Sequence, residues 1–270
     1  MRRYCAEAIL LEVSDLQEGD RIVTFLTREH GRKRGAARGA RRRYSRFAGQ
    51  LQPLAKVRVD WFEKQDRDLV RIADVDLLRP AGALASGLEG LLVGAYLAEQ
   101  TALFAQENEP SERTFRLLDA TTEAMIAGVD PLVCARYFEM WTLRLAGLLG
   151  DASVCPLCER PLGAAAVLPD EGETLVCSEC ARGASGRRIG AATLRLIDAF
   201  GRTPPRALGP APGVAGALRE LEVLCAEIRR RFLGHELRSY RVMERTLAEV
   251  GPAVGPAVGT EPVIGGEEPG

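Results

Sequence analysis

The chain has 270 residues, of which 46% are hydrophobic and 27% are charged, and its formal net charge is −1. Length and composition together predict a globular protein that buries a sizeable core in about two domains. No apolar run reaches the length of a membrane span and no signal peptide opens the sequence, which argues against a membrane protein and against an oxidising compartment.

The small net charge hides an asymmetry along the chain. Residues 1–80 carry 18 basic and 12 acidic side chains, a net charge of +6, whereas residues 81–270 carry 18 basic and 25 acidic ones, a net charge of −7. Such a division predicts different partners for the two parts, because a basic surface attracts polyanions and an acidic surface repels them.

Residues 1–80 are predicted to form a small β-barrel. Val57, Val59 and Trp61 alternate with polar residues, which is the period of a strand with one buried face. Four further β-rich runs precede Pro80, at residues 4–13, 21–27, about 32–38 and from 70 onward. An OB-fold is the natural candidate for five short strands, since it forms its ligand face from a sheet and flanking loops.

The strongest concentration of charge lies between residues 28 and 46, where nine basic side chains face a single acid, Glu29. Arginine forks grip phosphates, and the rings of Tyr44 and Phe47 beside them can stack on unpaired bases. The alternative is a solvated basic loop in an arginine-rich chain, but composition does not explain why nine positive charges gather in nineteen residues. Nucleic-acid binding is therefore the favoured interpretation. The predicted DNA contacts are Arg28, Arg32, Lys33, Arg34, Arg38, Arg41, Arg42, Arg43 and Arg46.

After Pro80 the hydrophobic period becomes helical. One helix is predicted to begin at Asp130-Pro131, a favourable N-cap and first-turn pair. Its apolar stripe consists of Cys134, Phe138, Trp141, Leu145 and Leu148. Similar stripes predict further helices at residues 86–105, 115–125 and 214–232. We expect a helical domain in two parts, residues 81–150 and 183–249, and a disordered Gly/Pro-rich tail at residues 250–270.

Four cysteines form two C-x-x-C pairs, Cys155 with Cys158 and Cys177 with Cys180, separated by eighteen residues. This spacing is typical of a tetrahedral zinc site, and four thiolates leave no position for a reacting water. We therefore expect one structural zinc ion per chain, held in a module of residues 151–182. A metal-free reduced remnant, a disulfide pair and a redox motif are the alternatives. Glu159 is unusual, because zinc knuckles often place glycine after the second cysteine.

Several enzyme classes find no support in these residues. A zinc-dependent nucleobase deaminase needs a His-x-Glu element and an open metal position, yet His30 is followed by Gly-Arg and His235 by Glu-Leu. No Gly-x-x-x-x-Gly-Lys-Ser/Thr loop supports ATP hydrolysis. A zinc-ribbon transcription or translation factor that binds duplex DNA or RNA is the alternative function, and a pure protein scaffold is a third.

Several segments together resemble the bacterial recombination mediator family RecO. Residues 7–11, 18–31 and 36–41 look like that family's N-terminal OB-fold, and residues 234–241 are similar to its C-terminal basic element. The four cysteines fit the zinc-binding members of the family. The resemblance extends over residues 4–247.

This resemblance implies a multidomain α+β protein, in which an N-terminal OB-fold β-barrel is followed by an α-helical domain carrying a four-cysteine zinc module. It implies a cytoplasmic, nucleoid-associated factor for DNA repair and homologous recombination, without catalytic residues. RecO proteins bind single- and double-stranded DNA and anneal complementary strands. They work with RecR, and in many bacteria with RecF, to load RecA onto DNA coated with single-stranded DNA-binding protein. We expect the same partners here.

Overall fold

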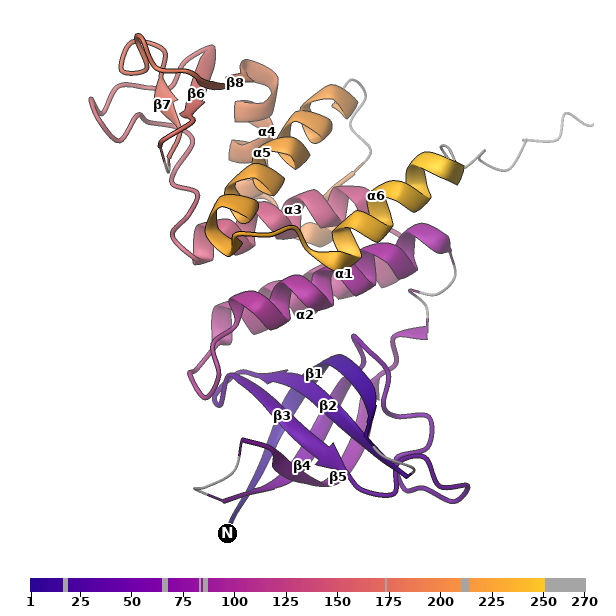
Figure 1. Cartoon of the computed structure of the whole chain (residues 1–270). Helices are drawn as coiled ribbons and strands as arrows, with labels where there is room; N and C mark the ends of the chain where they lie inside the picture. The colour runs from indigo at the N-terminus through magenta and orange to yellow at the C-terminus, as the bar shows by residue number, and fades with distance from the viewer. Residues whose placement is uncertain are drawn as a thin grey trace, which may run out of the picture.

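The computed structural model describes residues 1–16, 19–64, 68–82, 84, 87–172, 174–209 and 214–250. A β-barrel forms one end of the molecule, helices pack on it, and a small second sheet lies at the end remote from the barrel (Figure 1). The tail predicted to be disordered begins at the end of the last helix, and residues 251–270 lie outside the described part of the chain.

Five strands close the barrel in the order β1-β2-β3-β5-β4. Neighbouring strands are antiparallel except β3 and β5, which run parallel where Gly35 and Ala36 face Val70 and Arg71. This is the strand order of an OB-fold, so the predicted fold is confirmed. The strands are β1 (Arg2–Leu16), β2 (Asp20–Thr27), β3 (Arg32–Ala37), β4 (Lys56–Glu63) and β5 (Val70–Arg79).

The alternation of apolar and polar residues along β4 correctly predicts which of its side chains lie in the barrel core. Val57, Val59 and Trp61 on β4 are all fully buried, whereas Arg58 between them is exposed. Where β3 and β5 pair, there is no room for a side chain at Gly35, because a Cβ atom there would lie 2.7 Å from the Ile72 side chain. Glycine therefore allows β3 to approach β5 and complete the ring.

Within the described residues, the helical part contains six α-helices and the 3-10 turn η2. Asp130 caps α3 as predicted, accepting hydrogen bonds from the backbone N–H groups of Leu132 at 2.7 Å and Val133 at 3.3 Å. Gly90, on α1, sits where a Cβ would lie 2.4 Å from the carbonyl oxygen of Leu84, so close packing requires this glycine within a helix. The elements are α1 (Leu88–Phe104), α2 (Glu112–Ile126), α3 (Pro131–Leu145), α4 (Ala191–Arg202), η2 (Pro205–Ala207), α5 (Ala215–Leu233) and α6 (Arg238–Val250).

Between α3 and α4 the chain forms the four-cysteine module and its own sheet. The strands β6 (Ala165–Pro169), β7 (Val176–Cys177) and β8 (Gly186–Gly190) pair antiparallel in the order β7-β6-β8. β8 lies beyond residue 182 in the chain, and its pairing with β6 joins the cysteine module to the start of α4.

The barrel and the first helices share one hydrophobic core. Barrel residues such as Phe25 and Leu26 belong to the same buried cluster as Leu97 of α1 and Phe115 of α2. A second cluster joins α3, α4 and α5 to the cysteine module. Two cores therefore occupy the molecule, and α3 contributes side chains to both.

A network of buried charges joins the helices that come from distant parts of the chain. Glu139, on α3, is completely buried, and its carboxylate accepts hydrogen bonds from Tyr96 on α1 at 2.6 Å and from Arg136 at 3.0 Å. Arg229, on α5, is 1% exposed, and one of its nitrogens lies 3.7 Å from the Glu139 carboxylate. The same guanidinium donates to the Tyr96 hydroxyl and to Glu236, and lies over the ring of Tyr240 on α6 at 4.5 Å.

We predict that Arg229→Met destabilises the helical domain by about 3–5 kcal/mol, because it removes one partner from a buried charge network and leaves carboxylates without their full compensation. Urea denaturation followed by circular dichroism measures the effect. Arg230→Met is the matched control, since Arg230 is the next residue on the same helix and is exposed. Equal stability losses in the two variants would show that the network does not stabilise the fold.

Candidate metal centre and nucleic-acid interface

The structure brings the four predicted cysteines together. Their sulfur atoms all lie within 4.8 Å of one another, and the Sγ atoms of Cys158 and Cys177 are 3.7 Å apart. Four sulfurs about 2.3 Å from a zinc ion in a tetrahedron are separated by about 3.8 Å, so the arrangement fits this ion with small adjustments. The group comprises four cysteines and no further metal-binding side chain within the described residues, which is the composition of a closed structural site.

Each C-x-x-C pair lies on a tight turn. The N–H of Glu159 donates to the carbonyl of Cys155 at 2.8 Å, and the N–H of Ala181 donates to that of Cys177 at 3.0 Å. Glu159 has φ of 58°, in the left-handed region. The knuckle therefore needs the conformation that glycine adopts most easily, and a glutamate there costs about 1 kcal/mol.

Backbone donors favour the thiolate form of the first pair. Burial raises the pKa of the Cys155 thiol, but the N–H groups around it outweigh this effect and lower the pKa to about 6. Hydrogen bonding from Arg160 lowers the pKa of Cys158. Hydrogen bonds to Cys158 and Cys177 raise the pKa of Cys180 to about 12, because they hold its proton. The thiolate is the form of cysteine that binds a metal. A divalent cation bound here would offset the negative charge of these thiolates.

Three of the nine basic residues predicted to contact DNA lie at the junction with the helices. Lys33 is 7% exposed, and its ammonium group lies 3.0 Å from Glu63 and 2.7 Å from the side-chain oxygen of Asn108. Arg32 pairs with Glu107 at 3.1 Å. The Arg28 guanidinium lies over the ring of Phe115 at 4.8 Å. Through these contacts, the three side chains hold the α1–α2 loop and α2 against the barrel.

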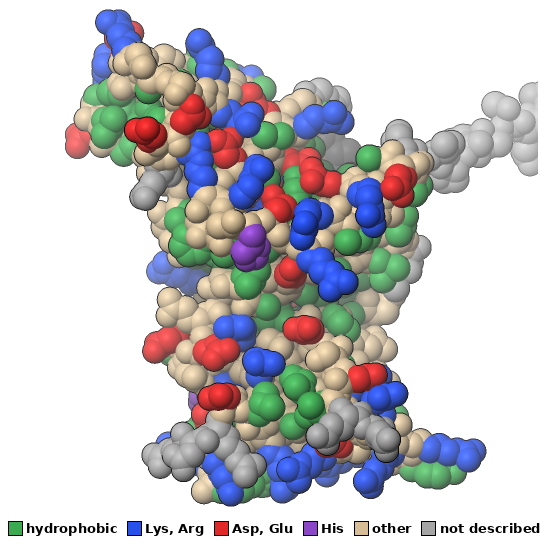
Figure 2. All heavy atoms as spheres, in the orientation of Figure 1, with side chains coloured by type: hydrophobic (Ala, Val, Ile, Leu, Met, Phe, Trp, Pro, Cys, Tyr) green, Lys and Arg blue, Asp and Glu red, His purple; other side chains and the backbone are tan. Residues whose placement is uncertain are grey.

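The other six predicted contacts are exposed. Among them, Arg41 lies 3.4 Å from Asp15, and the remaining five form no ion pair with any residue in the described ranges. Figure 2 shows Lys and Arg side chains gathered along the edge of the barrel remote from the helices. The six residues, which we call the arginine face, are Arg34, Arg38, Arg41, Arg42, Arg43 and Arg46.

The loop after β3 carries five of these arginines and is built from successive turns. Its base is held to the β1–β2 end of the barrel by two hydrogen bonds, from the N–H of Gly39 to Asp20 at 2.8 Å and from the N–H of Arg41 to the carbonyl of Gly19 at 3.1 Å. Phe47 is 2% exposed and belongs to the barrel core, so the idea that its ring stacks on bases is wrong. Tyr44 is 89% exposed.

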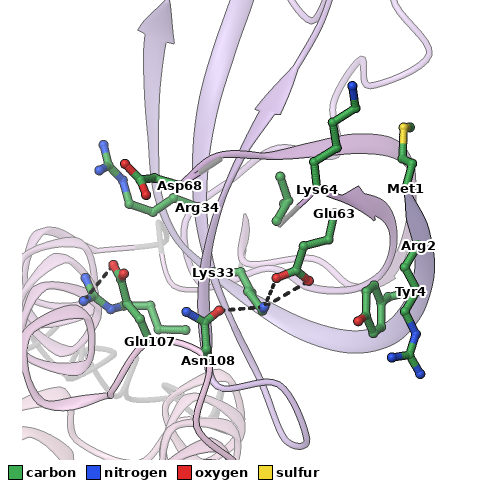
Figure 3. Close-up of a pocket in the computed structure, with 12 residues that line it drawn as sticks. Met1, Arg2, Tyr4, Lys33, Arg34, Glu63, Lys64, Asp68, Glu107 and Asn108 are labelled. Carbon is green, nitrogen blue, oxygen red and sulfur yellow. Dashed lines mark hydrogen bonds and ion pairs between the residues drawn. The ribbon is translucent and has the colours of Figure 1, made fainter. Parts of the chain in front are cut away.

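Two hollows lie on the barrel beside the arginine face. One has a volume of about 700 Å³, and Figure 3 shows Lys33, Glu63 and Asn108 pointing toward one another within it, while the Lys64 side chain extends away from them. The second, of about 710 Å³, is lined by residues of β3 and β5 and by those flanking the β1–β2 and β4–β5 connections. Strands 2 and 3 and these connections form the ligand face of OB-folds.

The hollows reveal cationic residues that lie outside the segment 28–46. Lys64 lines both hollows, Arg2 lines the first, and Arg71 lines the second with its guanidinium 5.3 Å from the centre of the Phe62 ring. The local density of charge in the sequence does not single them out, because they lie far from residues 28–46 along the chain and only closure of the barrel brings them beside β3. No helix in the part of the chain that the structure describes is long and apolar enough to cross a bilayer.

Comparisons with known proteins cover both parts of the chain. Residues 1–81 match the family "Recombination protein O N terminal", and residues 85–241 match "Recombination protein O C terminal". The "DNA repair protein RecO" of Anaeromyxobacter sp. (strain K) is 34% identical over 264 residues, which span 94% of this chain and 100% of that protein. Proteins of the same description from Koribacter versatilis and Geobacter sulfurreducens are 29% and 32% identical, over 89% and 78% of this chain and 98% and 90% of theirs. The chain belongs to the RecO family of DNA repair proteins.

Proposed function

We propose that this protein is a recombination mediator that binds single- and double-stranded DNA through its barrel, anneals complementary strands and helps to load RecA onto DNA coated with single-stranded DNA-binding protein. RecR, and RecF where it is present, are the expected partners, and the cytoplasm is the expected location. The single observation that carries the proposal is the arginine face, which leaves five guanidinium groups without an ion-pair partner in the described residues, on one end of a closed OB-fold.

Annealing follows from charge neutralisation on such a face. Two complementary strands repel each other through their phosphates, and a cationic surface that binds both lowers this repulsion and releases their counterions. Phosphate contacts carry no base information, so the face would serve any sequence. The helical part has an acidic excess and is better suited to protein partners than to DNA, because the same charge that attracts a basic partner repels a phosphate backbone.

For the four cysteines we infer one structural zinc ion per chain. Cys155, Cys158, Cys177 and Cys180 would hold it, and the ion would stabilise the fold of the module. The second hydrophobic core supports this role, because Cys155 and Cys177 are buried in the same cluster as Ile197 of α4 and Leu221 of α5. Loss of the ion would therefore disturb the packing of the helices that the module touches.

The first test concerns the arginine face. The triple variant Arg41→Glu, Arg42→Glu, Arg43→Glu should weaken binding to DNA of any sequence at least tenfold. It should also flatten the salt dependence on single strands by about 2 in the slope of log K against log salt, since each lost phosphate contact contributes about 0.7. Fluorescence anisotropy titrations at several salt concentrations measure both quantities, and annealing of complementary oligonucleotides should slow in parallel.

The matched control reverses three exposed arginines on the helical side, Arg188, Arg195 and Arg230, and so produces the same change in net charge. It should keep most of the affinity and the salt slope of the unmodified protein. If the control lost binding while the triple barrel variant kept it, the DNA surface would lie on the helical domain. Annealing of strands coated with single-stranded DNA-binding protein separates the mediator from a zinc-ribbon transcription or translation factor.

The second test concerns the metal. Protein purified without chelators should contain about one zinc per chain, and Cys177→Ser should lower the zinc content and make residues 151–182 more accessible to proteolysis, because a structural site couples metal binding to folding. Cys5→Ser is the control, since Cys5 is an exposed residue on the barrel. Elemental analysis measures the zinc, and metal-free protein with an intact module would refute the assignment.

A further inference from the structure

Tyr44 is the most exposed large apolar side chain in the described part of the chain. It leaves 89% of its surface open. A ring in this position gains nothing from the protein core, and aromatic rings exposed beside a cationic surface are the groups on which the bases of single strands stack. Phe47, three residues later, shows that the same loop can bury a ring when the fold requires it.

The loop fixes the place of Tyr44. A hydrogen bond from the N–H of Ser45 to the carbonyl of Arg42 at 3.0 Å closes the turn that contains Tyr44. Gly39 at the base has φ of 71°, and a Cβ there would meet the Arg42 side chain at 3.4 Å. These contacts and the buried Phe47 ring hold both ends of the turn in place. The exposed Tyr44 ring therefore projects from an ordered loop.

One cation lies over the Tyr44 ring, and others are exposed on the same loop. The Arg43 guanidinium lies 5.5 Å from the ring centre, and Arg41, Arg42 and Arg46 are exposed on the same loop. An arginine on one face of an aromatic ring polarises it and leaves the other face free for a flat partner. A nucleobase whose phosphate is held by the neighbouring arginines is the flat partner that this chemistry fits.

Stacking would depend on the state of the strand, whereas phosphate contacts would not. Bases in a duplex already stack on one another, and opening a step costs energy, so an exposed ring gains a base easily only from a single strand. Phosphates are available to arginine in both forms.

We propose that Tyr44 is a specificity-determining residue that stacks on an unpaired base and makes the arginine face favour single-stranded over duplex DNA. The inference rests on the proposed DNA-binding function and adds to it the property that lets one surface hold single strands and release the annealed product. The arginines supply affinity for any strand, and Tyr44 supplies the difference between the two forms.

The experiment compares three probes of equal length, an oligo-dT strand, a strand of abasic sites with the same phosphates, and a fully paired hairpin closed by a non-nucleotide linker. Tyr44→Ala should bind oligo-dT about five- to tenfold more weakly than the unmodified protein, since one aromatic–base stack is worth about that factor. Its affinity for the abasic strand and for the hairpin should not change, nor should its salt slope. Tyr44→Phe, which keeps the ring, should bind all three as the unmodified protein does.

A spectroscopic variant gives a readout that a structural role would not change. Oligo-dT should quench the indole emission of Tyr44→Trp more than it quenches the native Trp61 and Trp141, and the hairpin should not. Phe232→Ala is the control for loss of an exposed aromatic ring, because Phe232 is 56% exposed on α5, and its DNA affinity should be unchanged.

Two results would overturn the inference while leaving the proposed DNA-binding function intact. One is an equal loss of affinity for all three probes in Tyr44→Ala, and the other is no loss for oligo-dT. Failure of the unmodified protein to bind any probe would overturn the proposed function itself, and this inference with it.

Discussion

The burial of Glu139 constrains the rest of the helical domain. Burial raises the pKa of this carboxyl group, and the charges of Arg136 and Arg229 oppose that rise. A buried carboxylate without such partners would cost several kcal/mol, so α5 must return to α3 for the domain to close. Since Arg229 also contacts Tyr96 and Glu236, one guanidinium joins α1, α3 and the connection to α6. Residues separated by more than one hundred positions are thereby fixed in a single arrangement.

This closure explains how a metal module can be inserted into the middle of the domain. The chain leaves α3, forms the four-cysteine module and returns through β8 and α4 before α5 completes the buried network. The module is then held against α5 by polar contacts as well as by its core, since Arg231 donates to the carbonyl groups of Pro169 and Gly172, each at 2.8 Å. Its stability and that of the network are linked through one helix.

Features of this fold that depend on neighbouring residues can be predicted from the sequence, whereas contacts between residues far apart in the chain cannot. The period of β4, the Asp130 cap and the cysteine spacing each depend on residues close together in the chain, and the structure confirms the strand, the helix and the cysteine cluster. The sequence pattern assigns residues 183–249 to a helical domain but does not single out α4 or α6 within it; on α6 only Tyr240 and Met243 are buried, so its apolar stripe is short. The burial of Lys33 could not be foreseen either, since its partner Asn108 lies 75 residues away.

The cations of the barrel fall into two sets that differ in their ion-pair partners. On the side facing α2, Asp119 accepts from Lys56 at 2.9 Å and from Arg79 at 2.6 Å, so acids of the helical domain neutralise these cations. On the opposite side, the arginine face forms one ion pair with the described residues, between Arg41 and Asp15. Pairs that are partly buried are screened little by salt, whereas exposed arginines are screened strongly. The contact between barrel and helices should therefore persist at ionic strengths that weaken the attraction between the arginine face and a polyanion.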